Sequence, residues 1–418
     1  MNMFFLYQII VTVILLFSPI ILIFRLIKKK EDKIRFKEKL SIATKKKSKG
    51  NLIWFHGASV GELLSIIPLI KYYENKKYIS QILITSSTVS SSKVLEKFKL
   101  KKTVHQFYPI DHLYFTNKFL KFWKPKLAVF IESEIWPCMY RNLENENIPL
   151  VLLNARLTKK TFKRWMRMKN FAQSTFNKIK ISFPQNKETK LFLKKINTTN
   201  IKDLGNLKFV ENKLSKKSKF NKNLIDELKK RNIWVASSTH FGEEKFCAEA
   251  HIELKKKIKN LTTIIIPRHI HRVDKIVAEL KKLNLNVDVH SSRKKKLKNT
   301  DIYIVDTFGD TQQFHQVSSS VFLGGSFIKR GGQNPLEAAR YGARILHGPN
   351  IDNFKDIYKK LGSLKISMKV TTPKKLASTI VFKKNKFIGD KIKNIGTKIL
   401  KKTIKELDNI INNELKKT

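Results

Sequence analysis

Two short carboxylate motifs each follow an apolar run in the first half of the chain. In HGASVGE (56–62), small residues turn the chain and Glu62 falls where a helix is expected to begin. In IESEIWP (131–137), Glu132 and Glu134 alternate after an apolar strand, so a continuing strand places both on one face. An ionised carboxylate in a cleft can accept a proton from a substrate. These residues are candidates for acid–base chemistry; the simpler alternatives are a first-turn helix residue and surface charges beside a helix start.

Groups that suit an anion follow other expected strands. Lys208 ends GNLK (205–208), where it can act as a point charge for phosphate, although lysine is abundant in this chain. In SSTHFGEE (237–244), hydroxyl groups precede the free N–H groups of an expected helix. Arg268 and His269 come just after a very apolar run, and arginine is scarce, with only 13 among 85 basic residues. These groups predict an anionic ligand.

A glycine-rich segment between residues 323 and 349 is the most specific motif. Its two glycine pairs let the backbone approach a ligand, and Asn334 and Pro335 are expected to start a helix that faces a phosphate. Glu337, in the first turn, can accept hydrogen bonds from ribose hydroxyls. The glycine-rich segment, together with Arg268 and DTFGD (306–310), predicts a nucleotide site. The sequence has no GxGxxG fingerprint, no Walker lysine loop and no DxD motif.

The charge balance is strongly basic, with a net charge of +52. Lysines are scattered along every segment, and neither zinc-finger spacing nor an RNA-binding aromatic signature is present. We therefore expect a solvated surface with an attraction to anionic membrane, and no nucleic acid partner. Two cysteines cannot build a disulfide framework or a four-cysteine zinc site, and the histidines lack metal-binding spacing. No metal and no cofactor are expected.

The chain of 418 residues is too long for one core. Apolar runs alternate with helical patterns, which predicts α/β architecture with parallel sheets. The first series of expected strands ends before a lysine- and asparagine-rich stretch, residues 211–223, and a second series begins near Asn232. We expect two consecutive doubly wound, Rossmann-like domains that face a cleft, with ligands at the carboxyl ends of their strands. The expected strands are 51–57, 81–87, 126–133, 150–156, 233–239, 262–269, 287–291, 302–307, 320–326 and 343–348.

The chain begins with an apolar segment that has no charge from Met3 to Phe24. That length can span a bilayer, and the basic residues that follow it predict a cytoplasmic C-terminal side. We expect an uncleaved, single-pass transmembrane anchor (1–28), with the rest of the chain on the cytoplasmic face. The alternatives are a buried helix or a monotopic hairpin bent at Pro19. The basic stretch from Glu31 to Leu40 is expected to lie on the headgroups.

At these motifs the chain resembles the 3-deoxy-D-manno-octulosonic acid (Kdo) transferases of Gram-negative lipopolysaccharide synthesis. The resemblance implies a GT-B glycosyltransferase fold, an N-terminal membrane anchor, CMP-Kdo as the donor and a lipid A precursor as the acceptor. It also implies that Glu62 is the general base and that Glu132 and Lys208 stabilise the transition state. The matching stretches, in family order, are WFHGASVGE, FYPIDH, ESEIWP, NARLT, GNLKF, SSTHFGEE, PRH, DTFGD, GGSFIKRGGQNPLE and GPNIDNF.

The resemblance further implies an acceptor domain (29–212) and a CMP-Kdo-binding domain with C-terminal helices (213–418). On the acceptor side, Ser59, Gly61 and Glu134 are weaker candidates. The chain departs from the family pattern at Val210, Asp310 and Gln333, where aspartate, glutamate and histidine are usual. The donor-binding candidates are Pro267, Arg268, His269, Phe308, Gly309, Asp310, Gly324, Gly325, Ser326, Asn334, Pro335, Leu336 and Glu337.

Three other functions stay open. Another GT-B transferase with a different donor or acceptor would bind UDP or GDP sugars. A membrane-tethered nucleic-acid-binding protein would bind DNA or RNA with a steep salt dependence and would not bind CMP. A noncatalytic membrane scaffold would not need Glu62 or the glycine turns.

Overall fold

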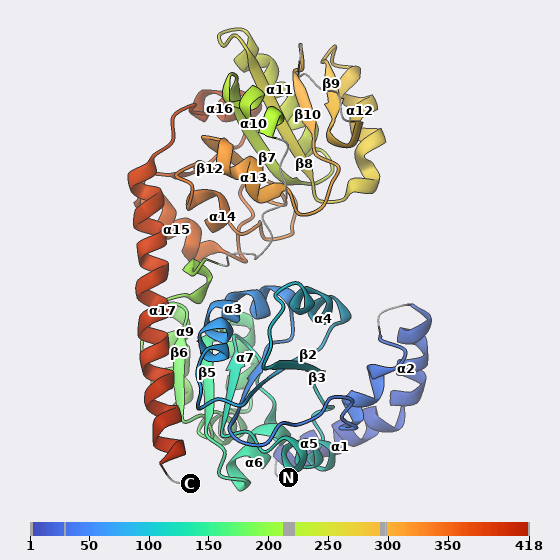
Figure 1. Ribbon diagram of the computed structural model, residues 1–418, viewed down its shortest axis with the longest axis vertical. Helices are drawn as coiled ribbons and strands as arrows, with labels where there is room; N and C mark the ends of the chain where they lie inside the picture. The colour runs from blue at the N-terminus through green and yellow to red at the C-terminus, as the bar shows by residue number, and fades with distance from the viewer. Residues whose placement is uncertain (1–2, 29–30, 212–221, 293–296, 298, 417–418) are drawn as a thin grey trace. The chain divides into compact units, whose positions relative to one another are not determined.

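The computed structural model describes residues 3–28, 31–211, 222–292, 297 and 299–416 (Figure 1). The chain divides into two compact units. Unit 1 comprises Met1–Ser215 with Gly396–Thr418, and unit 2 comprises Lys216–Ile395. Each unit contains one parallel sheet, so the predicted pair of doubly wound α/β domains is confirmed. Most of the expected boundary stretch, residues 211–223, lies outside the described residues.

Unit 1 is built on six parallel strands in the order β3-β2-β1-β4-β5-β6. This order reverses between β1 and β4, and ligands of open α/β sheets bind at the carboxyl ends of strands at such a point. The strands are β1 (Leu52–His56), β2 (Gln81–Ser86), β3 (Thr103–Phe107), β4 (Leu127–Ile131), β5 (Leu150–Ala155) and β6 (Ile181–Pro184). The helices that cover them are α3 (Val60–Glu74), α4 (Val89–Glu96), α5 (Leu113–Trp123), α6 (Pro137–Asn145), α7 (Lys159–Met166), α8 (Lys169–Phe176) and α9 (Lys187–Ile196).

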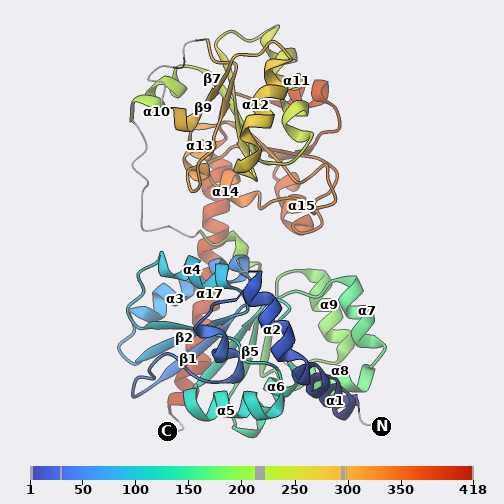
Figure 2. The ribbon, with the colours of Figure 1, turned by 90° about the vertical axis from the view of Figure 1, so that its right-hand side faces the viewer.

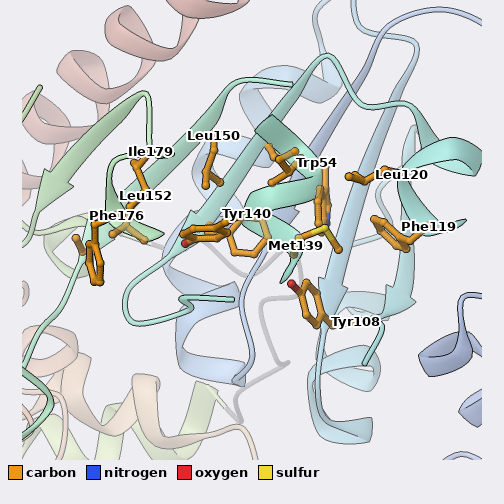
Figure 3. Close-up of a cluster of buried hydrophobic side chains, with 14 of the residues drawn as sticks. Trp54, Tyr108, Phe119, Leu120, Met139, Tyr140, Leu150, Leu152, Phe176 and Ile179 are labelled. Carbon is orange, nitrogen blue, oxygen red and sulfur yellow. The ribbon is translucent and has the colours of Figure 1, made fainter. Parts of the chain in front are cut away.

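The central strands of unit 1 are apolar on both faces, as a parallel sheet covered by helices requires. On one face Trp54 lies in a cluster with side chains of α5, α6 and α8, including Phe119, Met139 and Phe176 (Figure 3). On the other face the Phe55 ring lies 6.3 Å from the ring of Tyr73 in α3. This double burial fixes the sheet and therefore the loops at its carboxyl edge.

Unit 2 has seven parallel strands in the order β13-β12-β11-β7-β8-β10-β9. Its strands are β7 (Asn232–Thr239), β8 (Leu261–Pro267), β9 (Val287–Val289), β10 (Ile302–Ile304), β11 (Ser320–Leu323), β12 (Arg344–His347) and β13 (Ser367–Lys369). Its helices are α10 (Lys222–Lys229), α11 (Glu243–Lys255), α12 (Val273–Lys281), α13 (Thr311–Val317), α14 (Leu336–Ala339), α15 (Lys355–Ser363) and α16 (Pro373–Thr379).

The last helix, α17 (Lys386–Leu415), departs from the predicted domain division. We expected residues 213–418 to form the second domain, whereas the helix belongs to unit 1 from Gly396 onward. The Asp408 carboxylate of α17 accepts hydrogen bonds from the hydroxyl groups of Tyr72 (2.7 Å) and Tyr73 (3.0 Å). This pairing joins residues more than 330 positions apart, and no local pattern in the sequence indicates it.

The apolar N-terminal segment is not the one continuous helix that was predicted. Residues 3–27 form two helices, α1 (Met3–Leu16) and α2 (Ser18–Ile27), bent by 53°. Proline has no N–H to donate and its ring clashes with the carbonyl four residues earlier, so Pro19 is accommodated in the first turn of α2 and not within a longer helix. Among the described residues, no single helix is long and apolar enough to cross a membrane, although the bent pair passes by length and composition.

The stretch after the helical pair is fixed to unit 1. Residues 35–40 form a short 3₁₀ helix, η1 (Arg35–Leu40), whose charged side chains bond to unit 1. Arg35 Nη2 donates to the carbonyl oxygen of His105 at 2.7 Å, and the Glu38 carboxylate accepts from the N–H of Phe107 at 2.7 Å. The charges of Arg35 and Glu38 are therefore satisfied inside the protein, whereas contact of the exposed Lys33 and Lys37 with lipid headgroups stays a prediction.

Candidate functional site

Glu62 lies at the carboxyl edge of the unit 1 sheet, in the first turn of the helix that follows β1. Its carboxylate accepts from the N–H of Ala58 at 2.7 Å and from the hydroxyl of Ser59 at 3.0 Å, and Ser59 caps the helix in return. Glu62 is therefore a first-turn helix residue, and the capping geometry also holds its half-buried carboxylate in place; its acid–base role stays a prediction. Gly57 leaves room for it, since a Cβ there would lie 3.2 Å from Glu62 Cβ.

The surroundings of Glu62 raise the pKa of its carboxyl toward neutral pH. The pKa of the Glu62 carboxyl is raised to about 7, first by burial and then by the charges of Glu134 and Glu132. The hydrogen bonds from Ser59 and Ala58 oppose this shift. A carboxylate with a pKa near the working pH is matched to general-base catalysis.

Glu132 follows β4, the strand next to β1 across the switch point. Its backbone is in the left-handed region (φ 58°), held by hydrogen bonds to the carbonyl of Leu153 and from the N–H of Arg156, each 3.0 Å. Its buried carboxylate pairs with Lys208, with Oε1 2.6 Å from Nζ. A non-glycine residue persists in this conformation only where its surroundings hold it, which is typical of functional sites.

The loop that carries Lys208 is fixed by two asparagines. Asn206 Oδ1 accepts from the N–H of Lys208 at 2.9 Å, and Asn154 Oδ1 accepts from the N–H of Leu207 at 3.0 Å. Asn154 is buried at the end of β5 with φ 53°. It was not among the predicted site residues, although a polar residue after the apolar run LVLL was a usable signal.

Glu134 is held by a second network that was not predicted. His56 Nε2 lies 3.1 Å from Glu134 Oε2, and Trp136 Nε1 donates to the same oxygen at 2.9 Å. The fully buried His56 ring stacks on Tyr108 at 3.9 Å, and its Nδ1 lies 2.9 Å from the hydroxyl of Thr85. The position of His56, at the end of an apolar strand and the start of the motif HGASVGE, could have indicated its part in this network.

Unit 1 thus brings together the three carboxylates and the lysine singled out from the sequence. Glu132 is neutralised by Lys208, whereas Glu134 adds the larger of the two charge effects on Glu62. Ser59 joins this cluster through Glu62, but Gly61 is exposed and makes no comparable contact. The arrangement can take a proton at Glu62 and present one cation beside it.

In unit 2 the predicted donor residues lie at the carboxyl edge of the sheet. Pro267 ends β8, and the exposed Arg268 and His269 follow it. The His269 ring lies 5.5 Å from that of His240. Burial lowers the pKa of His240, the charge of Glu243 opposes this shift, and the neighbours His269, Arg330 and Arg268 lower the pKa further. Arg330 and His240 were missed by sequence reasoning, although both lie within motifs that were singled out.

The glycine-rich turn of unit 2 is already bound to an anion of the chain itself. The buried Glu243 carboxylate accepts from four N–H groups, those of His240 (2.9 Å), Gly325 (2.8 Å), Ser326 (3.1 Å) and Phe327 (3.0 Å). Gly324 is required by close approach, since a Cβ there would lie 2.4 Å from the carbonyl oxygen of Ser238. Direct donor contacts by this turn stay a prediction.

The helix expected after Asn334 and Pro335 is a single turn, α14. It begins one residue later than predicted, because Pro335 is the N-cap residue and not the first helical residue, and Asn334 precedes the cap. Asn334 Oδ1 still accepts from the N–H of Leu336 at 3.1 Å. Pro335 and Leu336 are buried. Glu337 retains exposed surface, although partial burial of its carboxyl raises the pKa of that group. One helical turn has a weak dipole, so the contribution expected from it to phosphate binding is small.

The DTFGD turn presents an aromatic ring to solvent. Thr307 donates to the Asp310 carboxylate at 2.6 Å, and Gly309 adopts φ 101°. This closed turn leaves the Phe308 side chain 79% exposed. Among the described residues, no group of three or more histidine, cysteine, aspartate or glutamate side chains is arranged to hold a metal ion.

Comparisons with known proteins agree with these motifs. The family model for 3-deoxy-D-manno-octulosonic-acid transferase (kdotransferase) matches residues 34–211. The chain is 39% identical over 315 residues to the 3-deoxy-D-manno-octulosonic acid transferase of Rickettsia felis, an alignment that covers 74% of this chain and 66% of that protein. It is 33% identical over 363 residues to the enzyme of the same name from Rickettsia bellii, with 87% and 86% covered.

The solved structure of a glycosyltransferase from Rickettsia africae ESF-5 has a TM-score of 0.55 to this chain at 12% identity, and covers 89% of this chain and 100% of that one. This likeness supports the GT-B arrangement of two parallel-sheet α/β domains. The structural likeness shows the fold alone, whereas the sequence matches show the family. The chain belongs to the 3-deoxy-D-manno-octulosonic-acid transferase family of glycosyltransferases.

Proposed function

We propose that this protein transfers Kdo from CMP-Kdo to a lipid A precursor during lipopolysaccharide synthesis, with Glu62 as the general base. The observation that carries the proposal is the Glu62 carboxylate, half-buried and with its pKa raised to about 7, beside the Glu132–Lys208 ion pair. Membership of the family supports the same chemistry. The R. felis relative, for which the chain covers 66% of the length, carries the name Kdo transferase.

The reaction is an inverting displacement. The acceptor hydroxyl loses its proton to a carboxylate oxygen of Glu62 as the hydroxyl oxygen attacks the anomeric carbon of Kdo. The bond from that carbon to the phosphate oxygen of CMP breaks on the opposite face, so CMP leaves as an anion. Base catalysis of this kind supplies roughly 10²–10⁴-fold, and positioning of the two substrates supplies much of the rest.

Lys208 and Glu132 act on the charge that develops during transfer. The Lys208 ammonium is desolvated and held by Glu132 at 2.6 Å, so it is preorganised. Preorganised charges in a water-poor site stabilise a transition state more than mobile ones do. Glu132 holds the lysine in place.

Unit 2 supplies the donor-binding segments. Arg268 bonds the CMP phosphate, Phe308 offers a ring face to a base, and Glu337 accepts from ribose hydroxyls. His269, Gly309, Asp310 and the turn from Asn334 shape the same site. Basic side chains can stabilise the leaving phosphate, so the proposed reaction uses no metal. The protein acts at the cytoplasmic face of the inner membrane, where its strongly basic surface favours anionic lipid.

The test is incubation of the purified protein with CMP-Kdo and a lipid A precursor, followed by mass spectrometry of the lipid. We expect a mass increase of one or more Kdo units, and no increase with UDP or GDP sugars. Glu62→Gln serves as the inactive variant, and Glu144→Gln, a surface carboxylate in α6 of the same unit, as the matched control. Transfer from a UDP or GDP sugar alone would assign a different GT-B activity.

A further inference from the structure

A buried histidine, His56, lies beside the carboxylates at the carboxyl edge of the unit 1 sheet. It is the last residue of β1, which pairs with β2 on one side and with β4 on the other. Figure 2 shows β1 and β2 side by side in this sheet. The side chain is fully buried, so both ring nitrogens need partners, because an unpaired polar atom in the interior costs stability. These partners come from the segments on either side of β1.

The Nδ1 side of the His56 ring faces Thr85 of β2. Nδ1 lies 2.9 Å from the hydroxyl oxygen of Thr85 and 3.2 Å from its carbonyl oxygen. The same hydroxyl oxygen accepts from Nε1 of Trp54 at 2.8 Å, and Trp54 is fixed in the apolar cluster of Figure 3. A hydroxyl group can donate or accept, so Thr85 satisfies Nδ1 with or without a hydrogen on it. Nε2 can therefore keep its N–H in both the neutral and the protonated ring.

The Nε2 side of the ring faces Glu134, which follows β4. Nε2 lies 3.1 Å from Glu134 Oε2, and Nε1 of Trp136 donates to the same oxygen at 2.9 Å. An ionised carboxylate only accepts hydrogen bonds, so Nε2 is the donor in the first of these contacts. Only 12% of the Glu134 side chain is exposed. Because bonds to an ionised group are stronger than neutral ones, the two N–H groups stabilise the charged form of Glu134 and fix its position.

The charge of Glu134 acts on its neighbour Glu62. Of the two carboxylates that raise the pKa of Glu62, Glu134 has the larger effect. The other, Glu132, is paired with Lys208, with Oε1 2.6 Å from Nζ. The position and charge of Glu134 therefore influence the pH at which Glu62 loses its proton.

Two tyrosines also face Glu134. The ring of Tyr108, after β3, lies 3.9 Å from that of His56, and the Tyr140 hydroxyl of α6 donates to the Glu134 carbonyl oxygen at 2.7 Å. Burial raises the pKa of both phenols, and so do the charges of Asp111 and Glu134. Both phenols therefore stay neutral, and the pH response of this cluster lies with its carboxylates and with His56.

We propose that His56 is a positioning residue of the transfer reaction, which holds the Glu134 carboxylate ionised and in place so that its charge acts on the base Glu62. His56 acts through Glu134 and not on the substrate. Removal of the Nε2–H donor should leave Glu134 with one N–H partner, so that its carboxylate takes up a proton or turns toward solvent. Either change weakens the charge beside Glu62, and the pKa of Glu62 should fall. The inference rests on the proposed function, in which Glu62 is the base.

Two substitutions separate the two sides of the ring. His56→Gln places an N–H donor near the position of Nε2, whereas His56→Asn keeps only a polar group that reaches Thr85. In profiles of kcat/KM from pH 5 to 9, the acid limb should stay in place in His56→Gln and move to lower pH in His56→Asn. The fraction of the plateau rate that His56→Asn retains at pH 6 should rise roughly threefold, as expected for loss of a neighbouring charge. An unmoved limb in His56→Asn, or an equal shift in both variants, would overturn the proposal.

A matched histidine in unit 2 controls for a general loss of stability. His251 is fully buried, its Nδ1 lies 2.9 Å from the Thr263 hydroxyl, and its Nε2 lies 3.5 Å from an oxygen of Asp301. His251→Asn should destabilise the protein to a similar extent and leave the acid limb in place. A limb that moves equally in His251→Asn would mean that destabilisation, and not the contact with Glu134, causes the shift.

The half-buried Trp136 provides a variant that leaves His56 intact. Trp136→Phe removes the second N–H donor to Glu134 Oε2, so the acid limb should move in the same direction as in His56→Asn. In a Glu134→Gln background neither substitution should move the limb further, because the charge that they hold is gone. A further shift in that background would overturn the route through Glu134.

Infrared titration separates failure of the inference from failure of the proposed function. The carboxyl band that is lost in Glu62→Gln reports the protonation of Glu62 without any transfer. Its midpoint should fall in His56→Asn and stay in place in His56→Gln. These midpoints in a protein that does not transfer Kdo would support the control of Glu62 by His56 and count against the proposed function only. Unmoved midpoints in a protein that transfers Kdo would overturn the role of His56 only.

Discussion

The carboxyl edges of the two sheets are prepared for their ligands in different ways. In unit 1 the functional side chains bond to one another: Glu62 to Ser59, Glu132 to Lys208 and Glu134 to His56. In unit 2 the glycine turn bonds inward to Glu243. The side chains that remain for a ligand there, Arg268 and Phe308 among them, are exposed.

The motifs of the two units therefore differ in how their residues are used. Unit 1 holds its charges in bonded pairs before any ligand arrives, so substitution of one partner should disturb the chemistry through the other. Unit 2 uses its most recognisable residues to build the loop and leaves fewer side chains for recognition. Substitutions in unit 1 are therefore expected to change the rate, and those in unit 2 the donor affinity.

The largest effect is expected at the base. Glu62→Gln should lower transfer at least ~10²-fold, the low end for removal of a general base. Its fold and CMP affinity should persist, because glutamine can occupy the same first-turn position and is a comparable helix former. Single-turnover transfer and calorimetric CMP binding measure the two quantities. Near-normal transfer would make Glu132 the leading candidate, and lost CMP binding would move Glu62 to the donor side.

The ion pair is expected to come next. Lys208→Met leaves the buried Glu132 carboxylate unpaired, and Glu132→Gln leaves Lys208 without its anchor, so each should lower transfer roughly 10- to 100-fold. Because the two act as a unit, the double variant should lose less than the product of the single effects. A double-mutant cycle on the transfer rate measures this coupling, and full additivity would contradict a shared role.

On the donor side the effect should appear in binding. Arg268→Ala removes a charge-assisted bond to phosphate and should weaken CMP-Kdo affinity roughly 10- to 100-fold with little change in the rate at saturation. Arg330→Ala should have a smaller effect in the same direction, because Arg330 shares the basic cluster around His240. Equilibrium binding to CMP measures both. A lower saturated rate with unchanged affinity would place Arg268 with the catalytic residues.

The pH dependence should follow the Glu62 carboxyl. Its pKa is raised to about 7, so the ionised base is lost as pH falls through 7, and the rate should drop about tenfold per unit below that. Glu134→Gln removes a negative neighbour that raises this pKa, so the acid limb should move to lower pH. Profiles of kcat/KM from pH 5 to 9 show the shift. An unmoved limb would mean that Glu134 does not influence the base.

Much of the fold was predictable because central strands are continuous apolar runs. All ten predicted strands are present, whereas the three that were missed, β3, β6 and β13, lie at sheet edges. Edge strands are paired on one side only, and β13 is largely exposed, so their sequences need no such run. The N-terminal helices were harder to predict for another reason. An apolar composition does not show whether the side chains face lipid or pack on unit 1.

The carboxylates and Lys208 were predictable because charged residues directly after apolar strands stand out. His56 and Asn154 were not selected, since their roles depend on partners more than 50 positions away in the sequence. The Glu243 network was missed for a related reason, because the sequence shows glycine N–H groups without showing that a carboxylate 82 residues earlier occupies them.

The contact between α17 and the Lys208 loop was equally invisible in the sequence. Gly396 in α17 lies against the loop so closely that a Cβ there would be 2.2 Å from the carbonyl oxygen of Phe209. On the other side of the loop, Gly205 approaches Ile399 of the same helix, with a Cβ position 2.9 Å from its terminal methyl group. The helix therefore supports the segment that presents Lys208 to Glu132.

The smallest effect on transfer is expected from Gly396→Ala, which makes no contact with substrate. The added methyl group must displace the Phe209 carbonyl, and with it the neighbouring Lys208, from the position in which Lys208 pairs with Glu132, so the rate should fall several-fold. Overpacking should also lower the free energy of unfolding by about 1–3 kcal/mol. The matched control is Gly362→Ala in α15, where the nearest atom lies 4.0 Å from the Cβ position and neither quantity should fall. In a Lys208→Met background, Gly396→Ala should still destabilise the protein but should no longer slow transfer, because the displaced group is gone. A further loss of rate in that background would mean that α17 acts on the site by another route than Lys208.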